Sequence, residues 1–163
     1  MQRIQDSELI PMSAEDTWNL IRDLSLRPVW DQTVSKVDRD ENLLHYVAPL
    51  FLGLSWYWTG EYITFEPPKD GLYALPTSGR SAIKMIYGSI TRPFKSLVGT
   101  WIVTPRDDRN AMLTMNISFE PRIPIPLLDI FMRGRVKKLL RKSLSKLSSL
   151  ASELNRDGQI SAH

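Results

Sequence analysis

Three side chains that could transfer a proton lie in segments dominated by apolar residues. Glu61 and Tyr62 belong to the aromatic run 54–65, and His45 lies in the apolar stretch 43–47. A carboxylate or imidazole facing an apolar cavity has a shifted pKa and can act as the acid or base of an aldol condensation or a dehydration. The alternative is that Glu61 points outward at a sheet edge and that His45 is solvated or packed. Glu61, Tyr62 and His45 are therefore the candidate catalytic residues.

The sequence does not support other kinds of active site. There is no cysteine, the only histidines are His45 and His163, and no carboxylates have the spacing of metal ligands, so we predict no metal and no cofactor. No serine occupies a Gly-x-Ser-x-Gly turn, and the glycines form no phosphate-binding loop. Arg80 and Arg92 could hold a carboxylate or phenolate, although arginines beside turns usually face solvent.

Large aromatic rings are numerous for one short sheet. A plain packed core is one explanation. The other is that at least two of the rings line a pocket for an apolar ligand, because such pockets are lined in this way. The candidate ligand-binding aromatic residues are Trp56, Trp58, Tyr62, Tyr87 and Trp101.

Length and composition indicate one globular domain. The chain has 163 residues, 42% of them hydrophobic and 24% charged, and we expect a single domain over residues 1–157 with a disordered tail at 158–163. The first residues lack the apolar segment of a signal peptide, and no stretch is long and apolar enough to span a membrane. We therefore expect a cytoplasmic protein.

The pattern along the chain predicts the elements that position these residues. Residues 3–12 read as a strand, and Ser13 with the acids after it predicts the start of a short helix that Pro28 limits to at most one more turn. Residues 33–120 read as about six strands separated by turn signals. Strict alternation in the run 54–65 would place Trp56, Trp58, Tyr62 and Thr64 on one face, and Tyr57, Glu61, Ile63 and Phe65 on the other.

A long amphipathic helix is predicted for residues 127–155. Apolar residues, among them Val136, Leu140 and Leu144, recur at helical spacing on one side. From Arg133 to Lys146 the chain has seven basic residues and no acid, whereas a merely soluble face usually mixes signs. This face either is simply solvated or meets an anionic partner. The candidate partner residues are Arg135, Lys137, Lys138, Arg141, Lys142 and Lys146.

This order of elements resembles the helix-grip arrangement of the START-like, or SRPBCC, superfamily. Residues 12–24 (MSAEDTWNLIRDL) and 27–30 (RPVW) are similar to its first-helix signature. Residues 93–105 and 113–120 are similar to the last two strands of coenzyme Q-binding START proteins, and polyketide aromatase/cyclases share the Gly-x-Trp strand. The resemblance implies an α+β fold in which a curved antiparallel sheet of six or seven strands surrounds a long C-terminal helix.

The resemblance also implies a function. Members of this superfamily hold a lipid, quinone, sterol or polyketide between sheet and helix, and some catalyse cyclisation or dehydration there. We expect a cavity of roughly 300 Å³ or more, bounded by the strand 56–62, the Trp101 strand and the helix around Val136, Leu140 and Leu144. The first hypothesis is a carrier of a hydrophobic small molecule, and the second is a polyketide cyclase/aromatase using the same cavity. An anionic membrane surface or an acidic carrier protein is the expected partner of the basic face, and nucleic acid is not.

Overall fold

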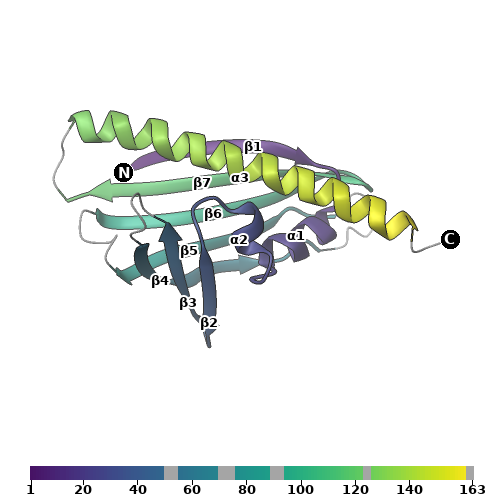
Figure 1. The fold of residues 1–163 in the computed structure, drawn as a ribbon, viewed down its shortest axis with the longest axis horizontal. Helices are drawn as coiled ribbons and strands as arrows, with labels where there is room; N and C mark the ends of the chain where they lie inside the picture. The colour runs from purple at the N-terminus through teal and green to yellow at the C-terminus, as the bar shows by residue number, and fades with distance from the viewer. Residues whose placement is uncertain (50–54, 70–75, 89–93, 123–125, 161–163) are drawn as a thin grey trace.

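The computed structural model describes residues 1–49, 55–69, 76–88, 94–122 and 126–160 of the chain (Figure 1). One strand is followed by two short helices, six further strands and one long helix. This order confirms the predicted α+β arrangement. The elements are β1 (Gln2–Ile10), α1 (Ala14–Arg22), α2 (Arg27–Trp30), β2 (Lys36–Asp40), β3 (Leu43–Pro49), β4 (Ser55–Glu66), β5 (Gly79–Gly88), β6 (Phe94–Asp107), β7 (Asn110–Pro121) and α3 (Pro126–Ile160).

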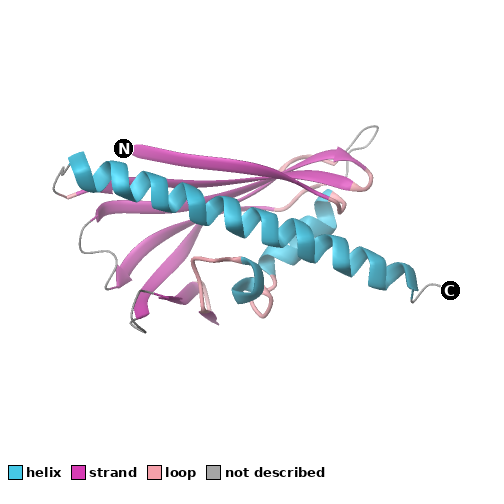
Figure 2. Ribbon diagram, turned by 45° about the horizontal axis from the view of Figure 1, so that its top comes forward, coloured by secondary structure: helices cyan, strands magenta, loops and turns pink. Residues whose placement is uncertain are grey.

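The strands form one antiparallel sheet that curves beneath α3. Their order is β1-β7-β6-β5-β4-β3-β2, so β2 to β7 form a meander and β1 closes the far edge against β7. In Figures 1 and 2, α3 runs across one face of this curved sheet, and α1 and α2 lie on the same side. The helix-grip architecture inferred from the sequence is thereby confirmed.

The two short helices begin and end where local chemistry requires. Ser13 caps α1, because its Oγ accepts a hydrogen bond from the backbone N–H of Asp16 at 3.0 Å. Trp18 and Ile21 are buried on the inner side of α1. Pro28 stands in the first turn of α2, which ends after Trp30, as the sequence predicted.

β4 departs from the strict alternation assumed for it. Its pairing with β5 shifts between Tyr62 and Thr64, which leaves Ile63 as the extra residue of a β-bulge. The bulge returns Phe65 to the face of Tyr62, and the two rings meet edge to face at 5.6 Å. The prediction that Phe65 shares a face with Glu61, opposite Tyr62, was therefore wrong.

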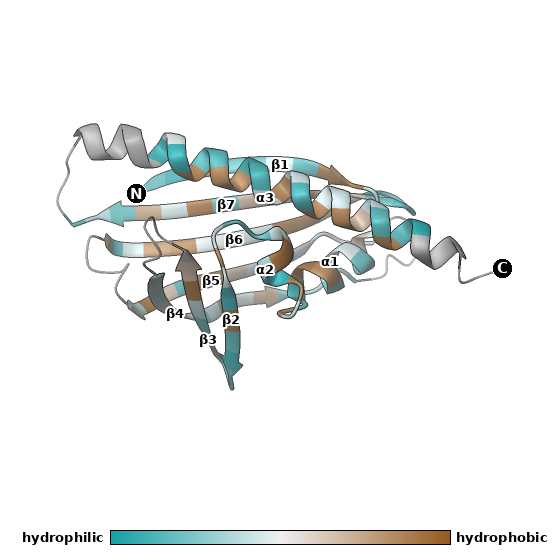
Figure 3. Ribbon diagram, viewed as in Figure 1, coloured by the Kyte–Doolittle hydropathy of each residue, from teal (hydrophilic) through white to brown (hydrophobic). Residues whose placement is uncertain are grey.

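α3 lays its apolar stripe on the sheet and turns its basic side outward (Figure 3). Leu140, Leu144, Leu147 and Ala151 are fully buried. The helix extends to Ile160, so residues 158–160 are helical and the predicted tail boundary is wrong. Residues 161–163 lie outside the described part of the chain.

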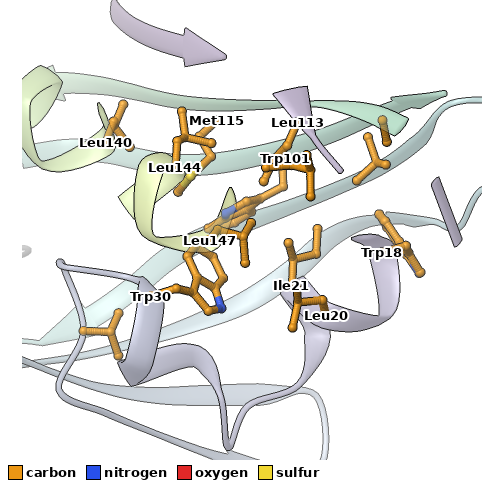
Figure 4. Packing of buried hydrophobic residues seen from close by; sticks show 14 of the residues in the cluster. Trp18, Leu20, Ile21, Trp30, Trp101, Leu113, Met115, Leu140, Leu144 and Leu147 are labelled. Carbon is orange, nitrogen blue, oxygen red and sulfur yellow. The ribbon is translucent and has the colours of Figure 1, made fainter. Parts of the chain in front are cut away.

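The core lies between α3, the short helices and the middle of the sheet. Figure 4 shows Trp30 and Trp101 beside Leu147 of α3, with Ile21 of α1 close by. Burying one such large apolar side chain contributes about 1.5–3 kcal/mol. This cluster holds α2 against α3 and so fixes one end of the space described next.

Candidate functional site: a cavity between sheet and helix

An internal cavity of about 160 Å³ lies between the sheet and the first half of α3. It is smaller than the roughly 300 Å³ expected from the sequence, which is the lower end of common ligand pockets. Most of its lining is apolar, and the apolar and aromatic lining residues are Val34, Tyr46, Ala48, Trp58, Ile83, Met85, Phe94, Leu97, Trp101, Met115, Ile117, Phe119, Val136 and Leu140.

A flat aromatic wall closes one side of the cavity. Tyr46 of β3 and Trp58 of β4 are directly opposite in the strand register. Their rings stack with centroids 3.7 Å apart and planes 7° from parallel. Neighbouring strands bring such opposed side chains within contact distance, so the register itself builds the wall.

A buried arginine stands at another part of the lining. Arg27 of α2 is 5% exposed, and its guanidinium group lies 4.7 Å from the ring centre of Trp30 and 4.6 Å from that of Trp101. Its Nε donates to Asp31 Oδ2 at 2.8 Å, and its Nη1 donates to the Ile21 carbonyl at 3.2 Å. The guanidinium group is therefore fixed by two rings and two hydrogen bonds.

Asp31 balances this charge, and both of its oxygens already accept hydrogen bonds. Its Oδ1 accepts from the backbone N–H of Thr33 at 3.0 Å and from the Thr33 hydroxyl at 2.6 Å. Arg27 occupies Oδ2. With both oxygens occupied and 2% of the residue exposed, Asp31 holds Arg27 in place and is poorly suited to accept a proton from a substrate.

Two further lining groups are hydrogen-bond donors. Trp101 Nε1 is buried and has no hydrogen-bond partner among the described residues. Burial raises the pKa of Tyr46 well above its ordinary value, so its phenol stays protonated at neutral pH. Arg27, Tyr46 and Trp101 therefore bring side chains with N–H and O–H groups into the lining of a largely apolar space, where Asn116 adds a buried amide oxygen without a partner among the described residues.

The structure divides the predicted ligand-binding residues. Trp58, Trp101, Val136 and Leu140 line the cavity. Leu144 lies beside it in the core. Trp56 is partly buried but does not line the cavity, and Tyr87 is 54% exposed and pairs with Thr59 away from it.

None of the predicted catalytic residues lines the cavity. His45 neighbours Tyr46 on β3, so strand alternation turns it to the opposite face, where its Nδ1 lies 2.9 Å from Thr59 Oγ1. Glu61 stands opposite Lys84 of β5, whose side chain is exposed. Tyr62 faces a separate pocket with Phe65. The expectation that these three groups share the cavity was wrong because strand register and the bulge decide their faces.

The minor candidates do not add to the cavity either. Arg80 is exposed, and Arg92 lies outside the described residues. Among the described residues, no group of His, Cys, Asp and Glu side chains could hold a metal ion. Within the same residues, no helix combines the length and apolar character that a membrane crossing requires.

Sequence reasoning missed Arg27, Asp31 and Tyr46. A signal was present: Arg27 and Asp31 are four residues apart in a segment that also contains Val29 and Trp30, and that spacing on a helix pairs opposite charges. Tyr46 carried no comparable signal, because its role depends on its pairing with Trp58.

Comparison with known proteins agrees with this architecture. The model of the family described as polyketide cyclase/dehydrase and lipid transport matches residues 1–152. A search of curated proteins finds no match.

Several solved structures share the fold at low sequence identity. Protein XoxI from Bacillus cereus is 15% identical, with a TM-score of 0.72 and coverage of 95% of this chain and 99% of that one. The Zhui aromatase/cyclase from Streptomyces sp. R1128 is 11% identical, with a TM-score of 0.71 and coverage of 93% of each chain. A START superfamily protein from Mycobacterium smegmatis is 15% identical, with a TM-score of 0.62 and coverage of 94% of this chain and 97% of that one.

Proposed function

The chain belongs to the polyketide cyclase/dehydrase and lipid transport family, and from this premise we propose that it binds and carries a hydrophobic small molecule in its cavity. The observation that carries the proposal is the buried indole nitrogen of Trp101, which lacks a hydrogen-bond partner among the described residues. Trp18 and Trp30 share this state, but of the three only Trp101 lines the cavity. A buried N–H without a partner costs free energy. A bound oxygen atom would remove that cost.

The donors define the polar end of the ligand. Arg27, Tyr46 and Trp101 can each donate, whereas both oxygens of Asp31 already accept hydrogen bonds. A carbonyl, enolate or phenolate oxygen suits this set, because it accepts hydrogen bonds and needs none in return. The stacked pair Tyr46–Trp58 suits a planar body. Quinones and polyketides combine these features, and a lipid would need a carbonyl near one end.

The cavity volume limits what the present conformation can hold. An apolar cavity of about 150 Å³ accommodates one benzene ring. The cavity of about 160 Å³ therefore fits one ring of a larger ligand, and the rest of that ligand would have to displace lining side chains such as Val136 or extend through an opening.

A polyketide cyclase is the second candidate, and the proximity of a cation to the aromatic wall favours it. Arg27 and Tyr46 would donate hydrogen bonds to the carbonyl oxygen that becomes negative when the enol carbon of the substrate attacks that carbonyl. The new C–C bond replaces the C=O π bond, and the enol hydroxyl proton passes through water to the new alkoxide. Neither Glu61 nor His45 has a role in this mechanism, because both lie away from the cavity.

Binding is tested with a small aromatic ketone as the probe, by calorimetric titration and native mass spectrometry. We expect one molecule per chain, and Tyr46→Phe and Trp101→Phe should each weaken binding about two- to tenfold through loss of one hydrogen bond. Tyr87→Phe is the matched control, since its ring is exposed outside the cavity. Unchanged affinity in both cavity variants would contradict the proposal.

The same variants separate carrier from enzyme. A carrier binds the ketone without changing it. The ketone extracted from the protein after incubation should therefore be identical to the ketone that was added. A cyclase converts a poly-β-ketone substrate, and this conversion should fall about 10²–10³-fold when the donor set is broken, as for other preorganised oxyanion sites.

We also propose that the basic side of α3 lets the protein lie on the anionic cytoplasmic face of a membrane while it loads or releases its ligand. Lys137, Lys138, Lys142 and Lys146 are exposed and have no ion pair among the described residues. From residue 133 to residue 146 the helix rises about 20 Å, so the charges are spread along this length of its exposed side, which a flat surface could contact. An acidic carrier protein is the alternative partner. Binding assays with vesicles and with such a protein distinguish the two.

A further inference from the structure

A second pocket, of about 280 Å³, lies outside the cavity and shares no residue with it. It is bounded by the end of α1, the β2–β3 hairpin and the second half of β4. Six residues line it: Arg22, Leu24, Arg39, Asn42, Tyr62 and Phe65. Two are cations, none is an acid, and three offer apolar or aromatic surface.

The first cation is held on an aromatic platform. The Arg22 guanidinium lies 4.7 Å from the ring centre of Phe65. Phe65 in turn contacts Trp18 of α1 and Tyr62 of its own strand, each with ring centres 5.6 Å apart. The β-bulge at Ile63 turns Phe65 to this side, so an irregularity of β4 builds the platform.

The second cation is oriented by the hairpin. Arg39 Nε donates to the Glu41 carbonyl at 2.8 Å, which leaves its terminal N–H groups unused. Arg39 stands opposite the buried Leu44, and strand alternation places its acidic neighbours Asp38 and Asp40 on the other face.

No carboxylate neutralises these two arginines within the described part of the chain. The acid next to Arg22 in the chain, Asp23, already accepts hydrogen bonds from the backbone N–H groups of Ser25 and Leu26 and from the Ser25 hydroxyl. These bonds, above all the one from the Ser25 hydroxyl, lower the pKa of Asp23, and they orient its carboxylate within its own turn. Two exposed arginines therefore line one pocket without a described ion pair, and one bound anion could pair with both.

We infer that this pocket is a second ligand site, which binds an oxyanion carried on an apolar body. A carboxylate or phosphate group would take the terminal N–H groups of Arg22 and Arg39, and the Asn42 amide could add a donor. The body would lie against Leu24, Tyr62 and Phe65. The site requires an anion and an apolar group together, which separates its ligand from free inorganic phosphate.

The test is calorimetric titration of the full chain with phenyl phosphate and benzoate, beside inorganic phosphate and neutral benzyl alcohol. The two aryl anions should bind with one site, and the other two probes should bind at least about tenfold more weakly. Arg22→Gln and Arg39→Gln should each weaken phenyl phosphate binding about tenfold, the loss expected for one charged hydrogen-bonding partner. Arg39→Lys, which keeps the charge, should recover part of the loss.

Two controls make the result decisive. Arg3→Gln removes the same charge from an exposed position on β1 and should leave the affinity unchanged. Val136→Trp fills the cavity and should also leave phenyl phosphate binding unchanged, because Val136 is remote from this pocket. Equal binding by the wild type and both glutamine variants, equal binding of benzyl alcohol, or loss of binding in Val136→Trp would each overturn the inference.

Discussion

At Arg27 the chain removes a guanidinium group from water and holds it between two indole rings with one carboxylate. Replacing a buried ion pair by well-packed apolar residues is often neutral or stabilising by about 1–4 kcal/mol. Stability alone therefore gives little reason to bury Arg27 and Asp31. Both residues line the cavity, so a guanidinium group that binds a ligand would explain why they are buried there.

Gly99 leaves room for the indole ring of Trp101 on the cavity wall. The two residues are two positions apart and so share a face of β6, and a Cβ at position 99 would lie 3.0 Å from Cη2 and 3.3 Å from Cζ3 of the indole. The Gly-x-Trp motif thus lets the ring lie flat over the backbone at the cavity wall. A Cβ at position 99 would push the ring by a few tenths of an ångström.

Gly99→Ala should therefore lower the free energy of unfolding by about 1–3 kcal/mol, the usual cost of overpacking a filled site. It should also weaken ketone binding, because the displaced indole moves toward the cavity. Urea unfolding measures the first effect and titration the second. The matched control is Gly134→Ala on α3, where a Cβ meets nothing within 4 Å. That control should stabilise the protein by about 0.4–1 kcal/mol. Equal stability of wild type and Gly99→Ala would show that the ring has room to move.

Among the elements, α2 is the shortest, and it contributes the buried Arg27 to the cavity lining. Its four residues are too few to form a helix unaided. It is held by Trp30 in the core and by Ser143 of α3, whose Oγ accepts a hydrogen bond at 2.9 Å from the backbone N–H of Gln32 just after α2. Ser143 is fully buried, so this bond ties the loop after α2 to the long helix.

Ser143→Ala should destabilise the fold by about 1–3 kcal/mol, because it leaves the Gln32 N–H without its partner. The readout is urea unfolding, together with amide hydrogen exchange at Gln32, which should become faster. Ser149→Ala is the control, since the Ser149 hydroxyl bonds only to the Ser145 carbonyl within α3 and faces solvent. If both variants lose the same stability, the link between α2 and α3 does not depend on this bond.

For the whole molecule, charge is distributed unevenly over an otherwise ordinary composition. The net charge is only +3, yet residues 121–163 contain nine basic and three acidic residues. α3 carries most of the basic ones on the side opposite its buried stripe. Arg141 is the one whose ion pair is described, with Asp6 of β1 at 3.3 Å. The helix therefore joins the cavity on one side to a cationic surface on the other.

Attachment to a membrane is tested by co-sedimentation with anionic and neutral vesicles across a salt series. Each basic residue near an anionic bilayer contributes about 1 kcal/mol to binding. The wild type should therefore bind anionic vesicles at low salt. It should detach at high salt, because the Debye length falls to about 3 Å at 1 M. The variant Lys137→Glu, Lys138→Glu, Arg141→Glu, Lys142→Glu should not bind.

The control reverses four scattered charges, as Lys36→Glu, Lys69→Glu, Lys84→Glu, Arg109→Glu, and should retain most of the binding despite the same net charge. An acidic carrier protein is assayed in parallel. If the protein binds the acidic carrier protein and not the vesicles, the partner is the carrier protein. If both variants bind anionic vesicles equally, the basic side of α3 has no role in binding.

Much of the fold was predictable because it depends on local signals. The cap at Ser13, the break at Pro28, the alternation in β7 and the apolar spacing in α3 each act within a few residues. Such signals decide which elements form and in what order. The presence of aromatic residues and helix residues such as Trp101 and Leu140 in the cavity wall was also foreseeable, because their segments had to face one another.

Only the tertiary structure decided which polar groups meet. Tyr46 lies on the cavity wall and His45 away from it because the register of β3 against β4 assigns the faces, and a shift by one residue would exchange them. The bulge at Ile63 likewise places Phe65 in the second pocket, which Arg22 and Arg39 line. Arg27 meets Trp101 across more than seventy residues of sequence. Sequence patterns report neighbours along the chain, whereas these contacts depend on pairing between distant segments.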